Sequence, residues 1–382
     1  METTCRKEKV NEDRPGRIKS LDAFRGLTIA AMILVNNPGS WSHVYRPLRH
    51  AEWHGWTVAD LVFPFFLFIV GISVAVSFGR RLEAGEERRP LYLKIIRRTL
   101  ILFTLGLLLN GFPYYDLSTL RIPGVLQRIA VCCLASSVIF LNSKWKGQLA
   151  WAVGMLLLYW GAMEWVPVPG ESAGLYEKGN NLASWIDGRL LAGHMWAVTK
   201  TWDPEGILST ITAISTTLFG VLAGRWLTGD NEPRNKAAGL IATGAFAAAA
   251  GSLWHLLMPI NKSLWTSSYT LFTAGLASIC LGALYWLADV RGWKRWTIPA
   301  RILGMNAIAA YLLAGIAARL LNLIKVHGPS GTPLTIKVWI YDSLFASWLG
   351  DLNASLAYAI AFILAVWLFM LPLYRMRIFI KI

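Results

Sequence analysis

Long apolar runs with almost no charge recur along this chain of 382 residues, and they restrict its fold more than any other feature. Apolar residues make up 55% of the chain, and the mean hydropathy is +0.46. A run of about 17–25 apolar residues can cross a bilayer as a helix, because a helix satisfies its backbone hydrogen bonds internally. The sequence therefore predicts an all-α polytopic membrane protein and excludes an ordinary soluble globule.

About ten such runs can be separated. The predicted spans cover residues 21–37, 58–78, 96–112, 122–141, 148–166, 205–226, 237–257, 265–288, 301–324 and 353–374. Residues 1–19 are basic and lack an apolar core, so we expect a cytoplasmic tail rather than a cleaved signal peptide. Residues 20–382 are then expected to form a single transmembrane domain.

The positive charge of the chain is distributed as in a membrane protein. There are 37 Lys and Arg against 22 Asp and Glu, a formal net charge of +15. With both termini in the cytoplasm, about 25 Lys and Arg fall on the inner side and about 9 on the outer side, as the positive-inside rule requires. The densest inner block covers residues 80–98. This distribution indicates membrane orientation and anionic ligands, and we expect no nucleic acid partner.

The outer loops are longer than the inner ones. Residues 38–57, 167–204 and 325–352 are rich in Trp, Gly, Asn and acids. They would cover an outward-facing cavity, as a polar substrate requires, although a pump or channel could show the same pattern. The four cysteines show neither a disulfide framework nor the spacing of metal ligands, so we expect no metal.

Three of the six histidines, His43, His50 and His54, lie in the loop between the first two predicted spans. An unperturbed imidazole titrates near pH 6.5, so such a loop is a candidate site of proton transfer. A lone interfacial histidine is more often a hydrogen-bonding residue than a catalyst, and we interpret His43 and His54 in that way. His50 is the exception because of the segment in which it stands.

Charged residues inside apolar spans are costly and suggest function. Arg25 follows Asp22 by three residues, so a structural ion pair and a role in anion binding both stay open. Gln127 and Arg128 are expected about two turns inside the fourth span. For Arg128 a functional or tightly paired role is favoured.

Six segments carry a resemblance to a known family. They are RHAEWHGWTVADLVFP (49–64), RIPGVLQR (121–128), WDPEGILSTI (202–211), INKSLWTSSY (260–269), GMN (304–306) and RIFIKI (377–382). In this order they resemble the signature segments of the heparan-alpha-glucosaminide N-acetyltransferase family of transmembrane acyltransferases. The lysosomal member of that family has a further luminal region and spanning helix. We therefore expect a minimal, bacterial member in the inner membrane.

The resemblance implies acetyl transfer from cytoplasmic acetyl-CoA to the amine of a terminal glucosamine on the far side of the membrane. His50 matches the catalytic histidine, as a general base or as a covalent carrier of the acetyl group. Asn36 matches an asparagine at the outer end of the first helix, whose amide could stabilise the oxyanion. Asp60 matches an acid that would orient His50.

The expected cofactor and acceptor each require binding residues. Candidates for the CoA phosphates, by location and charge, are Arg25, Arg97, Arg98 and Arg128. Candidates for the acceptor are Glu52, Trp53, Asp203 and Glu205. The expected partners are an amino-sugar or glycan acceptor and the lipid bilayer, and a homodimer is compatible with the sequence.

Two other functions stay open. A transporter or flippase of a sugar or lipid-linked glycan would also have about ten helices, although no internal repeat or pair of broken spans is evident here. A non-catalytic membrane scaffold would not need Asn36, His50 and Asp60 at one membrane face.

The predicted topology can be tested by labelling. Ten spans with both termini inside place Glu86 in the cytoplasm and Glu177 outside. Single cysteines at these two positions in a cysteine-free background should react with an impermeant maleimide from opposite sides. If both react from the same side, a helix has been miscounted.

Overall fold

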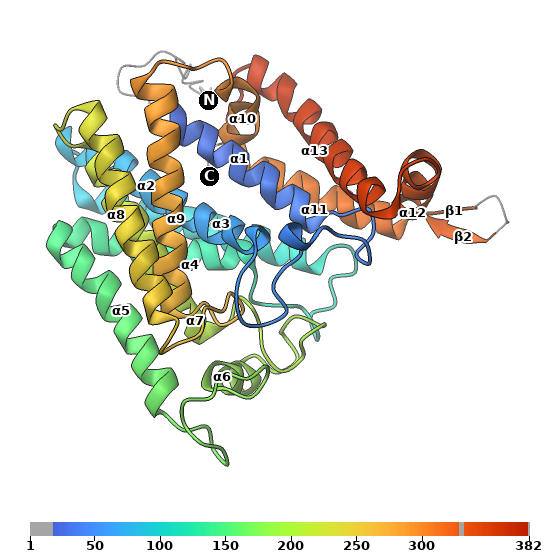
Figure 1. Ribbon diagram of the computed structural model, residues 1–382, viewed down its shortest axis with the longest axis horizontal. Helices are drawn as coiled ribbons and strands as arrows, with labels where there is room; N and C mark the ends of the chain where they lie inside the picture. Colours follow the sequence, from blue (N-terminus) through green and yellow to red (C-terminus); the bar gives the residue numbers. More distant parts are fainter. Residues whose placement is uncertain (1–17, 328–331, 381–382) are drawn as a thin grey trace, which may run out of the picture.

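The computed structural model describes residues 18–327 and 332–380, and these are mostly helical (Figure 1). The helices are α1 (Lys19–Asn36), α2 (Val58–Glu83), α3 (Arg88–Gly111), α4 (Val125–Asn142), α5 (Trp145–Trp165), α6 (Leu182–Leu190), α7 (Ile207–Thr228), α8 (Pro233–Trp254), α9 (Ser267–Tyr285), α10 (Thr297–Met305), α11 (Ala307–Leu323), α12 (Ile336–Tyr341) and α13 (Asp351–Arg375). Short helical segments are η1 (Arg46–Leu48), η2 (Trp286–Val290) and η3 (Asp342–Ala346). Most of the expected cytoplasmic tail, residues 1–17, lies outside the described residues.

Each of the ten predicted spans overlaps a long helix or, in one case, a pair of helices. Within residues 18–327 and 332–380, six helices are long and apolar enough to cross a membrane: α2, α4, α7, α8, α9 with η2, and α13. The pair α10 and α11 would be a seventh span. A multi-pass membrane protein is thereby supported, whereas the count of ten and the side of each terminus stay predictions.

The ninth predicted span is not continuous. Its two helices, α10 and α11, are bent by 78° at Asn306. The Asn306 side chain donates to the carbonyl of Ile378 (3.0 Å) and accepts from the backbone N–H of Ile380 (2.8 Å). The Asn306 side chain thus holds residues 378–380 against the bundle. Its two hydrogen bonds bring the signature segments 304–306 and 377–382 into contact.

The fourth span begins later than expected. Gly124 is extended and α4 begins at Val125, because Asn110 Nδ2 donates to the carbonyls of Arg121 and Pro123 (3.0 Å each) and holds them outside the helix. Arg128 therefore lies in the first turn of α4. The expectation of a position two turns inside the helix was wrong.

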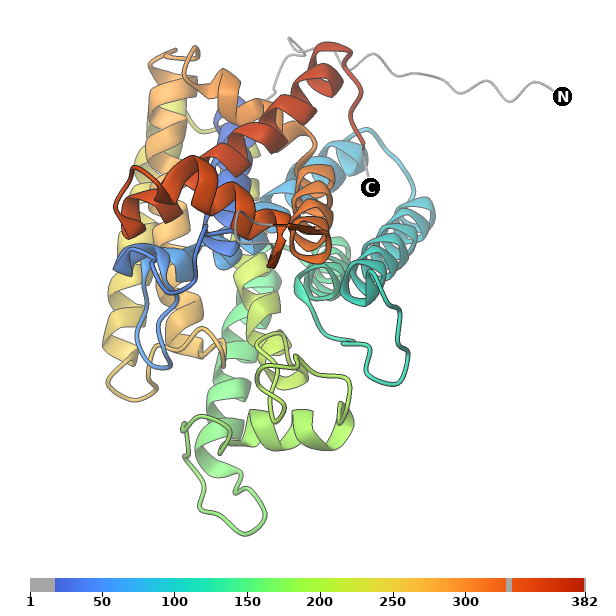
Figure 2. The same cartoon turned by 90° about the vertical axis from the view of Figure 1, so that its right-hand side faces the viewer.

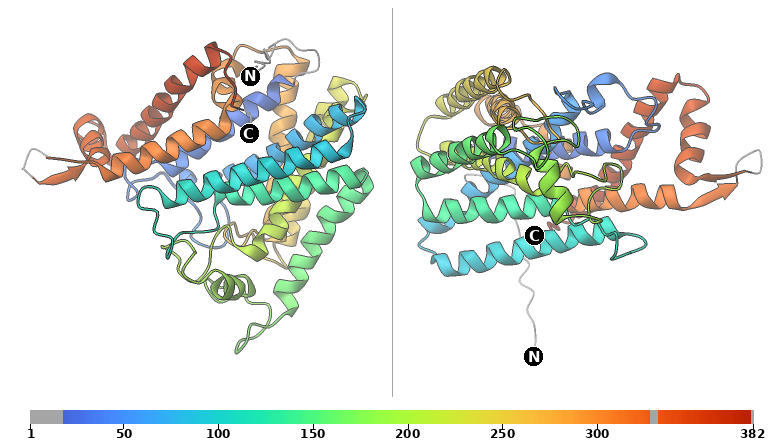
Figure 3. Two further views of the ribbon diagram at one scale, coloured as in Figure 1. Left: turned by 180° about the vertical axis from the view of Figure 1, so that it is seen from behind. Right: turned by 90° about the horizontal axis from the view of Figure 1, so that it is seen from below.

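The helices form a bundle in which α8 packs along α9, α2 along α7, and α3 along α4 (Figures 1 and 3). Helix α6 and the loops beside it lie at one end of the molecule, far from the C-terminal residues (Figure 2). Helix α12 and the antiparallel strands β1 (Lys325–His327) and β2 (Pro333–Thr335) project from the edge of the bundle (Figure 1).

Helices α2 and α7 approach closely because small residues face each other. A Cβ atom added at Gly71 would lie 1.9 Å from the carbonyl oxygen of Thr217, and one added at Gly220 would lie 2.0 Å from that of Phe68. Small residues that allow backbone contact are a common means of packing helices in membranes. This contact holds α2, which carries Asp60, against α7, whose first turn includes the end of the Trp202–Ile211 segment.

Substitution of Gly71 tests the importance of this contact. Gly71→Ala should destabilise the protein by roughly 1–3 kcal/mol, because the backbone of α7 must move to admit the methyl group. The matched control is Gly154→Ala, since a Cβ atom there meets nothing within 4 Å. Thermal unfolding of the purified protein measures both, and equal midpoints would contradict the proposed close packing.

Candidate functional site

The loop between α1 and α2 is built around the carboxylate of Asp60, in the first turn of α2. The Asp60 side chain is only 1% exposed. Its Oδ2 accepts hydrogen bonds from the backbone N–H groups of Ala51 and Thr57, both at 3.0 Å. A carboxylate is also stabilised by the partial positive charge of a helix N-terminus. The site therefore has a fixed buried anion.

His50 and Lys262 converge on the other oxygen of this carboxylate. Asp60 Oδ1 lies 2.7 Å from His50 Nδ1 and 3.4 Å from Lys262 Nζ. Lys262 Nζ lies 3.0 Å from His50 Nδ1 and 3.3 Å from Nε2. We call these three residues the Asp60–His50–Lys262 cluster. His50 remains 39% exposed, so its ring is accessible to a ligand.

Lys262 reaches the cluster from the loop between α8 and α9. The two loops are joined because Gly55, at a φ of +92°, donates its backbone N–H to the carbonyl of Ile260 at 2.8 Å. Burial lowers the pKa of Lys262, and the carboxylates of Asp60 and Glu205 partly oppose this shift. Sequence reasoning did not single out Lys262, although it stands in the quoted segment INKSLWTSSY.

Asp203 and Glu205 are held by a residue that was not predicted, Arg121. Arg121 Nε and Nη2 donate to the two oxygens of Asp203 at 2.8 and 2.6 Å, and Nη2 also meets Glu205 at 2.5 Å. Although burial opposes it, the two carboxylates raise the pKa of Arg121 above its ordinary value. Asp203 further accepts from the backbone of Trp196 at 2.9 Å, so its oxygens are engaged within the protein.

Glu205 lies among three cations. It is paired with Arg121 and lies within electrostatic range of both Lys262 and Arg128. Its side chain is 10% exposed. The second signature segment thus contacts the third one at this carboxylate, and Lys262 of the fourth segment interacts with it electrostatically.

Arg128 is buried and only partly satisfied. Its Nη2 donates to the carbonyl of Gly206 (3.1 Å) and to Ser209 Oγ (2.5 Å), and its guanidinium lies 5.0 Å from the ring centroid of Trp265. Within the described residues, Nε and Nη1 have no partner. A buried guanidinium with two unused nitrogens, which together carry three N–H groups, fits an anionic ligand or a polarised carbonyl.

The other predicted cations differ from Arg128. Arg25 forms an ion pair with Asp22 (3.4 Å) and donates to Ser73 Oγ (2.8 Å). Of the two roles left open by the sequence, this contact is the structural ion pair. Arg97 is exposed on α3, and Arg98 is half-buried beside it, with a buried Nε that has no hydrogen-bond partner within the described residues.

The predicted acceptor residues of the α1–α2 loop are placed as follows. Trp53 is half-buried, donates from Nε1 to the carbonyl of Tyr176 (2.7 Å) and packs edge-on against Trp202 with centroids 5.1 Å apart. Glu52 is exposed.

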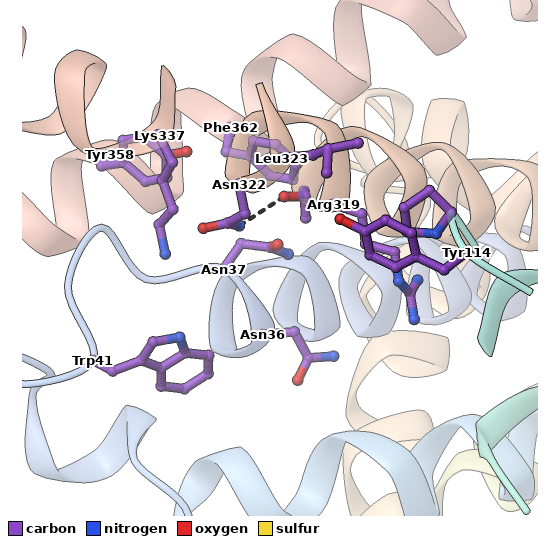
Figure 4. Close-up of a pocket in the computed structure, with 12 residues that line it drawn as sticks. Asn36, Asn37, Trp41, Tyr114, Arg319, Asn322, Leu323, Lys337, Tyr358 and Phe362 are labelled. Atoms are coloured by element: carbon purple, nitrogen blue, oxygen red, sulfur yellow. Dashed lines mark hydrogen bonds between the residues drawn. The ribbon is translucent and has the colours of Figure 1, made fainter. Parts of the chain in front are cut away.

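Asn36 lies in a different pocket, which we call the polar pocket (Figure 4). Its volume is about 360 Å³, and His50 and Asp60 are not among the residues that line it. Asn36, Asn37 and Trp41 contribute from the end of α1, and Arg319 and Lys337 contribute from α11 and α12. The structure therefore brings His50 and Asp60 together but places Asn36 with another set of side chains.

Among residues 18–327 and 332–380, no group of three or more His, Cys, Asp or Glu side chains could hold a metal ion.

A family model and two curated relatives that resemble this chain all carry the name heparan-alpha-glucosaminide N-acetyltransferase. Residues 17–170 match the sequence model of the family described as "Heparan-alpha-glucosaminide N-acetyltransferase, catalytic". Heparan-alpha-glucosaminide N-acetyltransferase of Homo sapiens is 32% identical over 357 residues, which cover 78% of this chain and 52% of the relative. The Mus musculus protein of the same name is 32% identical over 355 residues, covering 78% and 53%. The chain spans about half the length of these curated relatives.

Proposed function

We infer that the chain belongs to the heparan-alpha-glucosaminide N-acetyltransferase-like family of transmembrane acyltransferases, and we propose that it is itself a membrane-bound acetyltransferase. The donor is acetyl-CoA from the cytoplasm, and the acceptor is the amine of an amino sugar or terminal glucosamine-type glycan on the outer side. The observation that carries this proposal is the Asp60–His50–Lys262 cluster. We further propose that the membrane is a bacterial inner membrane. A homodimer stays a prediction.

His50 is suited to move the proton that this reaction releases. Its Nδ1 lies against Asp60, so the ring keeps a proton on Nδ1 and offers Nε2 as the acceptor. The amine nitrogen attacks the thioester carbonyl carbon, Nε2 takes the proton of the amine, the C–S bond breaks, and the sulfur leaves as a thiolate that receives the proton. A covalent acetyl-His50 route would use the same ring nitrogen, and both routes stay open.

Lys262 supplies a cation beside the reacting groups. Negative charge develops on the carbonyl oxygen during attack, and a preorganised cation in a partly desolvated site stabilises it. Lys262 Nζ lies 3.3 Å from His50 Nε2, so it lies beside the atom that handles the proton. A role of Asn36 in stabilising the oxyanion stays a prediction.

Arg128 and Glu205 are the residues that we propose to bind the donor and the acceptor. The two unpartnered nitrogens of Arg128, Nε and Nη1, fit the thioester carbonyl or a CoA phosphate, whereas Arg25 is engaged by Asp22 and Ser73. Glu205, whose side chain is 10% exposed, is suited to accept a hydrogen bond from the acceptor amine. Trp53 would provide an apolar wall, and roles for Glu52, Asp203, Arg97 and Arg98 stay predictions.

His50→Ala tests the proposed chemistry. If His50 carries the proton or the acetyl group, turnover of radiolabelled acetyl-CoA with glucosamine should fall at least about 10²-fold, while thermal stability and CoA binding stay close to wild type. His54→Ala in the same loop is the control, and it should lower turnover much less than His50→Ala does.

Retention of most acetyl transfer by His50→Ala would refute the assignment. The transporter alternative is examined with the same preparation, by comparing acetyl transfer in detergent with sugar uptake into vesicles. Uptake driven by a gradient, without any transfer in detergent, would favour a transporter.

Arg128→Ala tests how the donor is held. Loss of a buried phosphate or carbonyl contact should weaken CoA binding by about tenfold or more. We would measure affinity by calorimetry, with Arg25→Ala and Arg97→Ala beside it, and expect the smallest change at the exposed Arg97. Unchanged affinity in all three folded variants would mean that CoA is held elsewhere.

A further inference from the structure

Two pockets at the edge of the bundle are not lined by any residue of the Asp60–His50–Lys262 cluster. One is the polar pocket. The other, which we call the apolar pocket, has a volume of about 450 Å³ and is lined by apolar side chains of α11, α12, η3 and α13, including Leu320, Leu344 and Ala361. Tyr358 and Phe362 line both pockets, so the two are adjacent. A ligand that filled both would be amphipathic.

Lys337 lines the polar pocket and lies beside a residue that both pockets share. Its Nζ lies 5.9 Å from the ring centroid of Tyr358, which both pockets share. In the described part of the chain it has no ion pair with a carboxylate. Burial lowers the pKa of Lys337, because the ammonium is partly desolvated without a compensating anion. An anionic group bound beside Lys337 would supply the missing charge.

The polar pocket offers groups that suit a sugar. Trp41 and Tyr114 are exposed aromatic side chains on its rim (Figure 4). The amide nitrogens of Asn37 and Asn322 donate to backbone carbonyls at 2.8 and 2.7 Å, which leaves their side-chain oxygens to accept from hydroxyl groups. Aromatic faces with a few oriented polar groups are typical of small-molecule sites.

Polar residues continue from this pocket toward His50. Arg319 lines the polar pocket, and Tyr311 lies within electrostatic range of Arg319, Arg121 and Glu205. Glu205 in turn lies within range of Lys262, which contacts His50. To be acetylated, a sugar seated on the polar pocket would have to extend its amine past these side chains to the Asp60–His50–Lys262 cluster.

We propose that the acceptor is a lipid-linked amino-sugar phosphate and that the two pockets bind it together. The hydrocarbon chain occupies the apolar pocket, the phosphate rests on Lys337, and the sugar lies over the polar pocket. This inference rests on the proposed acetyl transfer and names the substrate class of that same site.

The test uses the full chain in phosphatidylcholine nanodiscs and three acceptors. The first is glucosamine joined through a phosphodiester to a decyl chain, the second is decyl glucosaminide without phosphate, and the third is glucosamine 1-phosphate without a chain. The first should have a kcat/KM about tenfold or more above either of the others, because it alone gains from both the charge and the buried chain.

Two variants separate the contributions of the pockets. Lys337→Gln should lower kcat/KM for the phosphodiester about fivefold and leave decyl glucosaminide unchanged. Lys325→Gln removes an exposed cation outside both pockets and is the control. Ala361→Trp should fill the apolar pocket and slow both decyl acceptors but not glucosamine 1-phosphate. Ile360→Trp, on the neighbouring exposed position of α13, is its control.

Equal kcat/KM for the three acceptors, or an equal effect of Lys337→Gln on all of them, would overturn this inference while leaving acetyl transfer intact. If no acceptor is acetylated, the proposed function fails, and calorimetry with the N-acetylated phosphodiester still decides the inference. Binding that Lys337→Gln weakens supports it, and absence of binding overturns it. Phosphatidylglycerol that displaces this probe with equal affinity would show a general phospholipid site, which also overturns it.

Discussion

The buried carboxylate of Asp60 is the interaction on which the candidate site depends. It is satisfied on one oxygen by the backbone of Ala51 and Thr57, and on the other by His50 and Lys262. A buried anion is costly unless it is paired and hydrogen-bonded, so this single group requires the loop, the ring and the lysine to converge. The resulting geometry fixes the His50 ring while leaving one face accessible to substrate.

Charge balance explains how further ionised groups are tolerated nearby. Asp203 and Glu205 both bind Arg121, and Glu205 is also close to Lys262 and Arg128. Removing one member of such a set is expected to leave an uncompensated buried charge. Arg128 is the member with unused hydrogen-bonding capacity, and this is why we assign it to the donor rather than to the scaffold.

The sequence predicted those features of the fold and site that depend on residues close together in the chain. Apolar runs located the helical spans, because a bilayer forces the backbone into helices of a defined length. The pairing of His50 with Asp60 could also be anticipated, since both lie in one signature segment, ten residues apart. Lys262 could not, because it is 212 residues from His50 and joins it only through packing of two loops. The break at Asn306 and the pairing of Arg121 with Asp203 likewise depend on tertiary contacts that apolar periodicity does not encode.

The most direct test of the central claim is the turnover of Asp60→Asn. The amide oxygen of asparagine can still accept from Ala51 and Thr57, but its nitrogen now donates toward His50 Nδ1 and opposes the required tautomer. We predict a fall in kcat of at least about 10²-fold, with CoA affinity and the thermal unfolding midpoint close to wild type. A folded Asp60→Asn protein with near-normal kcat would contradict the account, because His50 would then act without the carboxylate that positions it.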